Sequence, residues 1–366
     1  MRKAVECGRM KEREVFLDKL RVAATCAVVL LHTVSGVADT TDMSLYPEER
    51  KVFWAMLDLV SWCVPVFLMI SGYLFLNPGR QIGIGSMVTK YCRRIVLALF
   101  LFGMPYGCLE LTAVEGRFCP GMLWETFLGL LCGKTWAHMW YLYLILLLYL
   151  LTPFLRRALG AVPRWAVYGV LAVLFTGCSV LPCLYMLSGK KGFALPGDGI
   201  YFFYYICGYL FAVEKREGIK KAVRRGIIPG LALLLAGGLA FSRLWGGLVP
   251  RMAYNYPFTV LLALLLFVWA AGAGHCVRPF WTRAGALCFA VYLVHPVFLN
   301  LAYKYFELTP LAVSDPLSVL YPLAEGIPIP AAVAVSVAIF FGGTAVLSVL
   351  AAWILYRIRP LRRYVL

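Results

Sequence analysis

Residues 16–37 read FLDKLRVAATCAVVLLHTVSGV, a mostly apolar run of about 22 residues, which is the length that one α-helix needs to cross a bilayer. The rest of the chain is of the same kind. Of its 366 residues 62% are apolar and 14% are charged, and the mean hydropathy is +0.80. A soluble domain is about half apolar and a quarter charged. The composition therefore excludes a soluble globular protein and predicts an all-α membrane protein.

Apolar runs, bounded by charges or by Gly/Pro clusters, divide the chain into about ten spans. They lie at roughly 16–37, 53–76, 93–113, 138–156, 164–186, 199–214, 226–244, 255–273, 282–303 and 330–356. The run at 121–133 is too short to span, so we expect it to lie at the interface or to re-enter the membrane. We predict a polytopic bundle that forms a single integral-membrane domain over residues 1–366, with an N-terminal segment 1–15, the bundle at 16–356 and a tail at 357–366.

The distribution of Lys and Arg along the chain predicts the orientation of the spans in the membrane. Lys and Arg outnumber Asp and Glu by 35 to 18, for a formal net charge of +17. In a soluble protein this excess would suggest a nucleic-acid partner, but in a membrane protein Lys and Arg collect in the cytoplasmic loops. Most of them fall on one side of the predicted spans if the N-terminus is inside. We therefore predict cytoplasmic N- and C-termini and no nucleic-acid partner.

Ionisable residues within the first span share one helical face. Arg21 and His32 are 11 residues apart, a rotation of three turns plus about 20°, and Asp18 and Thr25 lie on the same stripe. Such groups are costly at membrane depth and usually functional. One interpretation places Arg21 at a cytoplasmic mouth and His32, as a reactive group, in the outer half of the membrane. The other is an interfacial Arg that snorkels and a His that a neighbouring helix satisfies.

Asp58 lies about five residues into the second predicted span, near the depth expected for His32. A carboxylate can hold an imidazole in one tautomer and raise its basicity. The sequence therefore predicts that Asp58 pairs with His32, with a position closer to the interface as the alternative.

Two further segments combine small or basic polar residues with the spans. Residues 64–73 read VPVFLMISGY, in which Ser71-Gly72 permits close backbone approach between helices. Lys90, Arg93 and Arg94 precede the third span. These cations could grip phosphates, although membrane topology alone would also supply them.

Aromatic and histidine residues gather near the outer ends of two spans, in His138-Met139-Trp140-Tyr141 and in Tyr292 to His295. Trp and Tyr at such positions are also typical of an interfacial belt. The histidines lack a metal-binding spacing, so we expect no metal site. The twelve cysteines form no CxxC pair; Cys119 and Cys132 share an outer loop and could form a disulfide.

Together these motifs resemble the acyltransferase 3 family of multi-pass bacterial membrane proteins. The Arg21 to His32 spacing is similar to the family's Arg, ten residues, His pattern, Pro65 to Gly72 to its Pro-x-Phe-Phe-x-x-Ser-Gly segment, and Lys90 to Arg94 to its basic patch. His138 to Pro153 and Tyr292 to Pro296 resemble two further signatures. Ile145 stands where many glycan-modifying members have Glu. The Trp140-Tyr141-Leu142 form resembles the branch near the enterobacterial-antigen acetyltransferases and the membrane half of the vancomycin-resistance serine racemases, without a racemase domain.

The resemblance implies an O-acyltransferase of the bacterial plasma membrane. It would move an acyl group, typically acetyl, from cytoplasmic acyl-CoA to a hydroxyl of an extracytoplasmic or lipid-linked saccharide, with the acyl-CoA as co-substrate and no permanently bound cofactor. We assign each expected role to a set of residues, namely chemistry to His32, Arg21 and Asp58, acyl-CoA binding to Lys90, Arg93, Arg94 and Ser71, and acceptor binding to His138, Trp140, Tyr141, Tyr292 and His295. His32 would act either as a general base or as an acyl-carrying nucleophile.

A transporter is the competing class. Membrane helices with intramembrane Arg, His and Asp would also suit a proton-coupled carrier or a flippase, for example for serine uptake. A transporter of this kind is often built from paired, Gly/Pro-broken helices in two related halves. The sequence shows no clear pair of this kind, which favours the enzyme.

Overall fold

The computed structural model describes residues 2–213, 254–272, 279–314, 321–323 and 326–366, together with short pieces between 226 and 237. Every regular element within these residues is helical, with short 3₁₀ and π segments beside the α-helices. The prediction of an all-α protein is therefore confirmed for the part of the chain that is described.

Seven of the described helical segments are long and apolar enough to cross a membrane. They are Val15–Thr40 in α1 (Arg2–Thr40), Pro47–Phe75 with α2 (Pro47–Val60) and α3 (Cys63–Phe75), Ile84–Glu115 with α4 (Ile84–Ser86) and α5 (Arg93–Glu115), Ala137–Ala161 with α7 (Trp140–Ala161), Arg164–Ser188 with α8 (Arg164–Phe175) and α9 (Leu181–Ser188), Pro279–Tyr305 with α14 (Pro279–Asn300), and Ile329–Arg357, which is α15. They coincide with seven of the predicted spans.

Three predicted spans are not of this kind. The helices α10 (Gly199–Val213) and α13 (Pro257–Gly272) are apolar but have only 15 and 16 residues, which is below the usual spanning length. The predicted span at 226–244 lies largely outside the described residues. The short run after Pro120 forms α6 (Gly121–Leu131), whose 11 residues are too few to span, as expected.

The chain divides into two compact units. Unit 1 comprises Met1–Leu74 and Arg164–Ala352, and unit 2 comprises Phe75–Pro163 and Trp353–Leu366. Each unit draws on two separate stretches of the sequence, and each is described here by itself.

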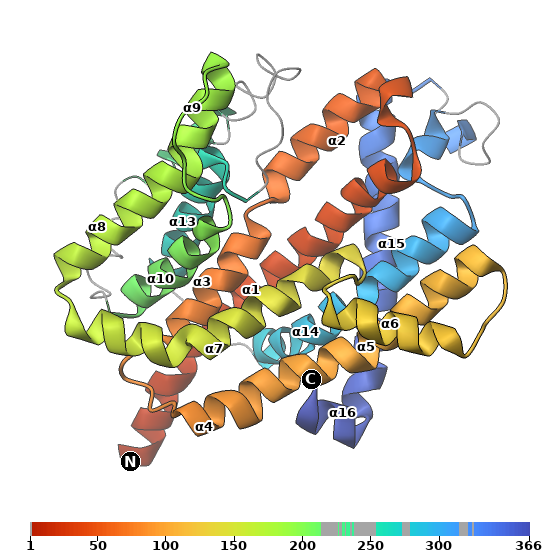
Figure 1. Ribbon diagram of the computed structural model, residues 1–366. Helices are drawn as coiled ribbons and strands as arrows, with labels where there is room; N and C mark the ends of the chain where they lie inside the picture. The colour runs from red at the N-terminus through yellow and green to blue at the C-terminus, as the bar shows by residue number, and fades with distance from the viewer. Residues whose placement is uncertain are drawn as a thin grey trace. The chain divides into compact units, whose positions relative to one another are not determined.

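In unit 1, the first helix is the central packing element. It packs along α14, and it also contacts α2 and α13; Figure 1 shows α1 in red with α2 in orange returning beside it. A buried apolar cluster ties α1 and α2 to the later helices through Val34, Val37, Phe53, Leu299, Tyr303, Leu311, Val333 and Val337. This packing holds α1 against α14.

Glycines allow two helices of unit 1 to touch through their backbones. A Cβ atom on Gly72 of α3 would collide with the carbonyl oxygen of Tyr205 in α10, and a Cβ atom on Gly208 would collide with the carbonyl oxygen of Met69. The close approach that Ser71-Gly72 predicts is thus confirmed, and it comes from small residues on both helices.

In unit 2, α5 packs against α6 through Gly103 and Gly107, where a Cβ atom would meet Leu130 and Thr126 respectively. Arg156 of α7 stabilises the segment between α3 and α4, because its guanidinium donates to the carbonyl oxygens of Phe75 at 2.8 Å and Arg80 at 2.7 Å. This arginine therefore has a structural contact in addition to its place in the charge pattern.

Candidate functional site

The polar stripe of α1 begins with an ion pair. Arg21 Nη1 donates to Asp18 Oδ1 at 2.7 Å, and the two side chains are 31% and 13% exposed. The facing residue of α14 is Gly285, where a Cβ atom would lie 3.0 Å from the same carboxylate oxygen. Glycine here makes room for Asp18 against the neighbouring helix.

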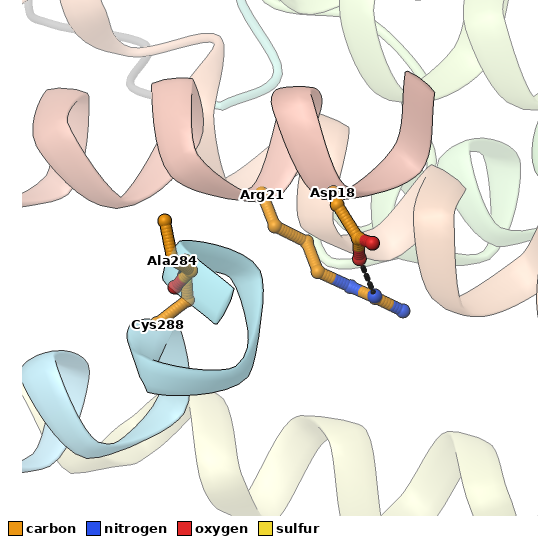
Figure 2. Close-up of polar contacts among 4 residues, drawn as sticks. All are labelled: Asp18, Arg21, Ala284 and Cys288. Carbon is orange, nitrogen blue, oxygen red and sulfur yellow. Dashed lines mark hydrogen bonds and ion pairs between the residues drawn. The ribbon is translucent and has the colours of Figure 1, made fainter. Parts of the chain in front are cut away.

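The next turn of the stripe meets a cysteine. Cys288 lies on α14 beside Arg21 and Thr25. The charge of Arg21 and the hydroxyl of Thr25 both interact with its thiol, which donates a hydrogen bond to the carbonyl oxygen of Ala284 at 3.4 Å. Figure 2 shows Arg21 reaching along α1 to Asp18, with Ala284 and Cys288 on the adjoining turn of α14. The cysteine is a neighbour of Arg21 that the sequence did not single out.

The C-terminal part of the stripe joins two histidines from distant parts of the chain. His295 Nε2 of α14 lies 3.2 Å from His32 Nδ1 of α1, and the ring centroids are 4.9 Å apart. Each Nδ1 also lies close to the carbonyl oxygen four residues earlier, at 2.9 Å from Val28 for His32 and at 3.1 Å from Val291 for His295. The sequence predicted both residues for the outer half of the membrane but not their contact.

These contacts define the tautomers of the neutral pair. A carbonyl oxygen can only accept, so both Nδ1 atoms carry the proton that they donate to Val28 and Val291. The lone pair of His295 Nε2 then faces the Nδ1–H of His32, and the basic lone pair of His32 is on Nε2. A neighbouring helix thus satisfies His32, as the structural interpretation anticipated, and the imidazole keeps a basic nitrogen.

We name this set the α1–α14 seam: Asp18, Arg21, Thr25 and His32 of α1, with Gly285, Cys288 and His295 of α14. His295 is fully buried, whereas His32 is only half-buried although protein surrounds it closely. The seam therefore brings a cation, a carboxylate and an imidazole to one helical interface within unit 1.

Asp58 lies on α2 and is half-buried. It is close enough to Tyr256, just before α13, for its charge to act on that phenol. The carboxylate of Asp39, seven residues after His32 on α1, acts on the His32 ring. The pairing of Asp58 with His32 stays a prediction, and Asp39 is a second acidic neighbour that the sequence reasoning missed although it follows the same stripe.

Tyrosines cluster next to His295. The ring centroids of Tyr292 and His295 are 6.2 Å apart, and Tyr292 is close enough to Tyr254 for the two phenols to interact electrostatically. The ring centroids of Tyr254 and Tyr201 are 6.4 Å apart. Tyr204 donates its hydroxyl proton to the carbonyl oxygen of Tyr254 at 2.6 Å. Tyr292 was a predicted site residue; the Tyr254-Asn255-Tyr256 segment was not, although its paired phenols before a span are visible in the sequence.

The basic patch, Lys90, Arg93 and Arg94, lies in unit 2 at the start of α5. Lys90 and Arg93 are exposed, and they face the rings of Tyr91 and Tyr364 at 5.2 and 5.4 Å from the ring centroids. Arg94 donates from Nε to the carbonyl oxygen of Val365 at 2.6 Å. The patch therefore offers exposed cations, with one arginine also attached to the segment after α16 (Arg359–Tyr364).

The other predicted site residues divide between the units. Ser71 is half-buried on α3 of unit 1, next to the close contact at Gly72. In unit 2 His138 is buried beside Tyr106 and Trp136, with ring centroids 6.2 Å away in each case. Trp140 and Tyr141 are half-buried at the start of α7.

Among the described residues no cluster of three or more His, Cys, Asp or Glu could hold a metal ion. The ten described cysteines are free, Cys119 and Cys132 included. Within this part of the chain the polar chemistry therefore rests on the seam, the tyrosine cluster and the basic patch.

The comparisons with known proteins agree with a transfer reaction. A family model described as an acyltransferase domain matches residues 14–357, which includes both histidines of the seam and the basic patch. No curated protein and no solved structure matches the chain significantly.

Proposed function

Because the chain belongs to the acyltransferase 3 family and is an acyltransferase, we propose that it transfers an acetyl group from cytoplasmic acetyl-CoA to a hydroxyl of an extracytoplasmic or lipid-linked saccharide. The observation that carries the proposal is the seam itself, in which an Arg–Asp pair and an imidazole with its basic nitrogen on Nε2 lie along one helix face. The transporter alternative has no comparable support.

His32 is the proposed reactive group. As a general base, its Nε2 takes the proton of the acceptor hydroxyl while the oxygen attacks the thioester carbon; the carbon–sulfur bond breaks, and the thiolate of CoA takes the proton back from Nε2. As a nucleophile, Nε2 attacks the thioester carbon first, the carbon–sulfur bond breaks, and CoA leaves as the thiolate from an acyl-imidazolium. The acceptor oxygen then attacks the acyl carbon, the carbon–nitrogen bond breaks and returns the lone pair to Nε2, and the hydroxyl proton passes to the thiolate. Both routes need the same lone pair.

The cations are the proposed donor-binding groups. The nucleotide of acetyl-CoA is polyanionic and cannot enter hydrocarbon, so exposed arginines with their planar, forked donors suit its phosphates. We assign this binding to Lys90, Arg93 and Arg94, with Ser71 as a polar neighbour of the acyl-CoA arm. Arg21, held by Asp18, is assigned to the inner end of the seam, where its positive charge suits a phosphate at the inner end of the acyl-CoA arm.

Acceptor recognition is assigned to aromatic side chains. Sugars present apolar faces and hydroxyl groups, which suit rings with a polar tip. Tyr292 beside the histidine pair, and His138, Trp140 and Tyr141 at the start of α7, are the proposed acceptor contacts. Asp58 is assigned to orienting the His32 ring.

The proposal includes a topology. About ten membrane crossings with both termini in the cytoplasm would leave the basic loops inside, in the bacterial plasma membrane. The α1 helix would then run from the cytoplasmic side at Arg21 to the outer half of the membrane at His32, about 16 Å along the axis at 1.5 Å per residue.

The test is the His32→Ala variant in membranes that contain radiolabelled acetyl-CoA. We expect transfer of label to the saccharide fraction to fall by more than about 10³-fold, because the variant lacks the Nε2 lone pair that both routes use. The Tyr303→Phe variant is the matched control, since Tyr303 packs on the same part of α1 and its hydroxyl donates to the carbonyl oxygen of Thr33. Equal transfer by the wild type and His32→Ala, at equal protein levels, would remove His32 from the reaction. A wild type that labels no saccharide would refute the proposed function.

A further inference from the structure

We infer that His295 is a positioning residue, which holds His32 in the tautomer and orientation that present its basic Nε2. The inference deepens the proposed function and rests on it for its kinetic test. The inference rests on which nitrogens meet at the contact of the two rings. His295 Nε2 faces His32 Nδ1 at 3.2 Å, while both Nδ1 atoms face carbonyl oxygens.

The ring nitrogens of His295 are both engaged within the protein. Its Nδ1 donates to the carbonyl oxygen of Val291, and its Nε2 accepts from His32. The side chain is fully buried. A group with this environment can act on the reaction through His32, and it does not contact the acceptor directly.

The pair has a single favourable place for an added proton. A proton on His295 Nε2 would point at the Nδ1–H of His32 and set two donors against each other. A proton on His32 Nε2 leaves the contacts of Nδ1 intact, since Val28 and His295 still accept from Nδ1. In either route the imidazole becomes positively charged, and a lone pair behind Nδ1 stabilises that charge as a carboxylate does in a catalytic triad.

The helix register keeps His295 in place. Thr25 lies beside Cys288, and seven residues further on both helices His32 meets His295, so α1 and α14 run parallel in a seven-residue register. Contacts on both sides of the pair lock this register. On the N-terminal side of the pair, Gly285 leaves room for the Asp18 side chain. On the C-terminal side, Tyr303 donates its hydroxyl proton to the carbonyl oxygen of Thr33 at 2.7 Å.

The kinetic test compares two substitutions of one side chain. His295→Leu keeps the volume and removes the acceptor, whereas His295→Gln places an amide oxygen near the former Nε2. We expect His295→Leu to lower the turnover rate at saturating acetyl-CoA by about 10- to 100-fold, the usual effect of losing such a supporting partner, with the KM for acetyl-CoA within about 2-fold of wild type. His295→Gln should recover to within about 5-fold of wild type.

The Tyr303→Phe variant loses the hydrogen bond to Thr33 but keeps its ring in the buried cluster with Val34 and Val37. Because this packing still holds α1 against α14, the variant should keep the wild-type turnover rate within about 2-fold. Wild-type turnover in His295→Leu, or equal loss in His295→Leu and His295→Gln, would overturn the inference while the proposed function stood.

A spectroscopic test needs no substrate and no folded variant at position 295. Nitrogen-15 spectra of wild-type protein with labelled histidine report which ring nitrogen carries the proton, and the chain has only four histidines to assign. The His32 signals, identified by their loss in His32→Asn, should show the Nδ1–H tautomer in the neutral form. An Nε2–H tautomer would overturn the inference whether or not acetyl transfer is detected.

Discussion

The α1–α14 seam and the basic patch are both rich in polar residues, but the protein satisfies them differently. In the seam, Arg21 and Asp18 pair at 2.7 Å and His32 has contacts to Val28 and His295. In the patch, Lys90 and Arg93 are exposed and lie over aromatic rings. Within a membrane, polar groups must find partners in the protein because water is absent. At an exposed surface water satisfies them.

This contrast shows that the contacts of a residue indicate its role in the seam but not in the basic patch. A partner in the seam reveals how the side chain is oriented and which nitrogen holds a proton. An exposed cation leaves its purpose open between topology and ligand binding, because both need the same positive charge. The experiments below therefore probe the seam through geometry and the patch through affinity.

The largest effect is expected from breaking the inner end of the seam. Arg21→Ala should lower acetyl transfer by about 10²- to 10³-fold, because it removes the positive charge assigned to the acyl-CoA arm and leaves the Asp18 carboxylate without this partner at a helix interface. Transfer from radiolabelled acetyl-CoA measures the loss. In Arg21→Ala with Asp18→Asn the unpaired carboxylate is absent, so the double variant should accumulate better while transfer stays low. Recovery of transfer in the double variant would reduce Arg21 to a structural partner of Asp18.

A smaller effect is expected at the patch. Arg93→Ala with Arg94→Ala should weaken acetyl-CoA binding by about 10- to 30-fold, since each exposed charge-assisted contact to a phosphate contributes about 1 kcal/mol. Titration of acetyl-CoA against detergent-solubilised protein measures the affinity. Arg157→Ala is the matched control, because Arg157 is an exposed arginine of the same unit. Equal affinity in all three proteins would assign the patch to membrane topology.

The sequence predicted much of this arrangement, and the limits have physical causes. Helical periodicity placed Asp18, Arg21 and His32 on one face of α1, because the rotation per residue is constant along a helix. It could not identify the facing helix, since the contact between His32 and His295 joins residues 263 positions apart. Such a partner is decided by the packing of Gly285 and Tyr303 against α1, which no local pattern encodes.

Span length was similarly informative for long helices and less so for short ones. Seven predicted spans coincide with long apolar helices. Within the described residues, the predicted spans at 199–214 and 255–273 form helices of 15 and 16 residues, so hydropathy located these two helices but did not predict their length. The close approach at Gly72 was predictable from a small residue, but its partner Gly208 on α10 was not.

The smallest effect should come from the carboxylates near His32, and it decides between two of them. Asp58 was predicted to orient the ring, whereas Asp39 acts on His32 from the same helix. If Asp58 orients His32, Asp58→Asn should lower the turnover rate by about 5- to 10-fold and leave the KM for acetyl-CoA unchanged. Asp39 is exposed near the C-terminal end of α1, where water screens its charge, so Asp39→Asn should change the rate by less than about 2-fold. The reverse order would transfer the orienting role to Asp39, and the groups that set the position and charge of His32 would then lie on α1 and α14 alone.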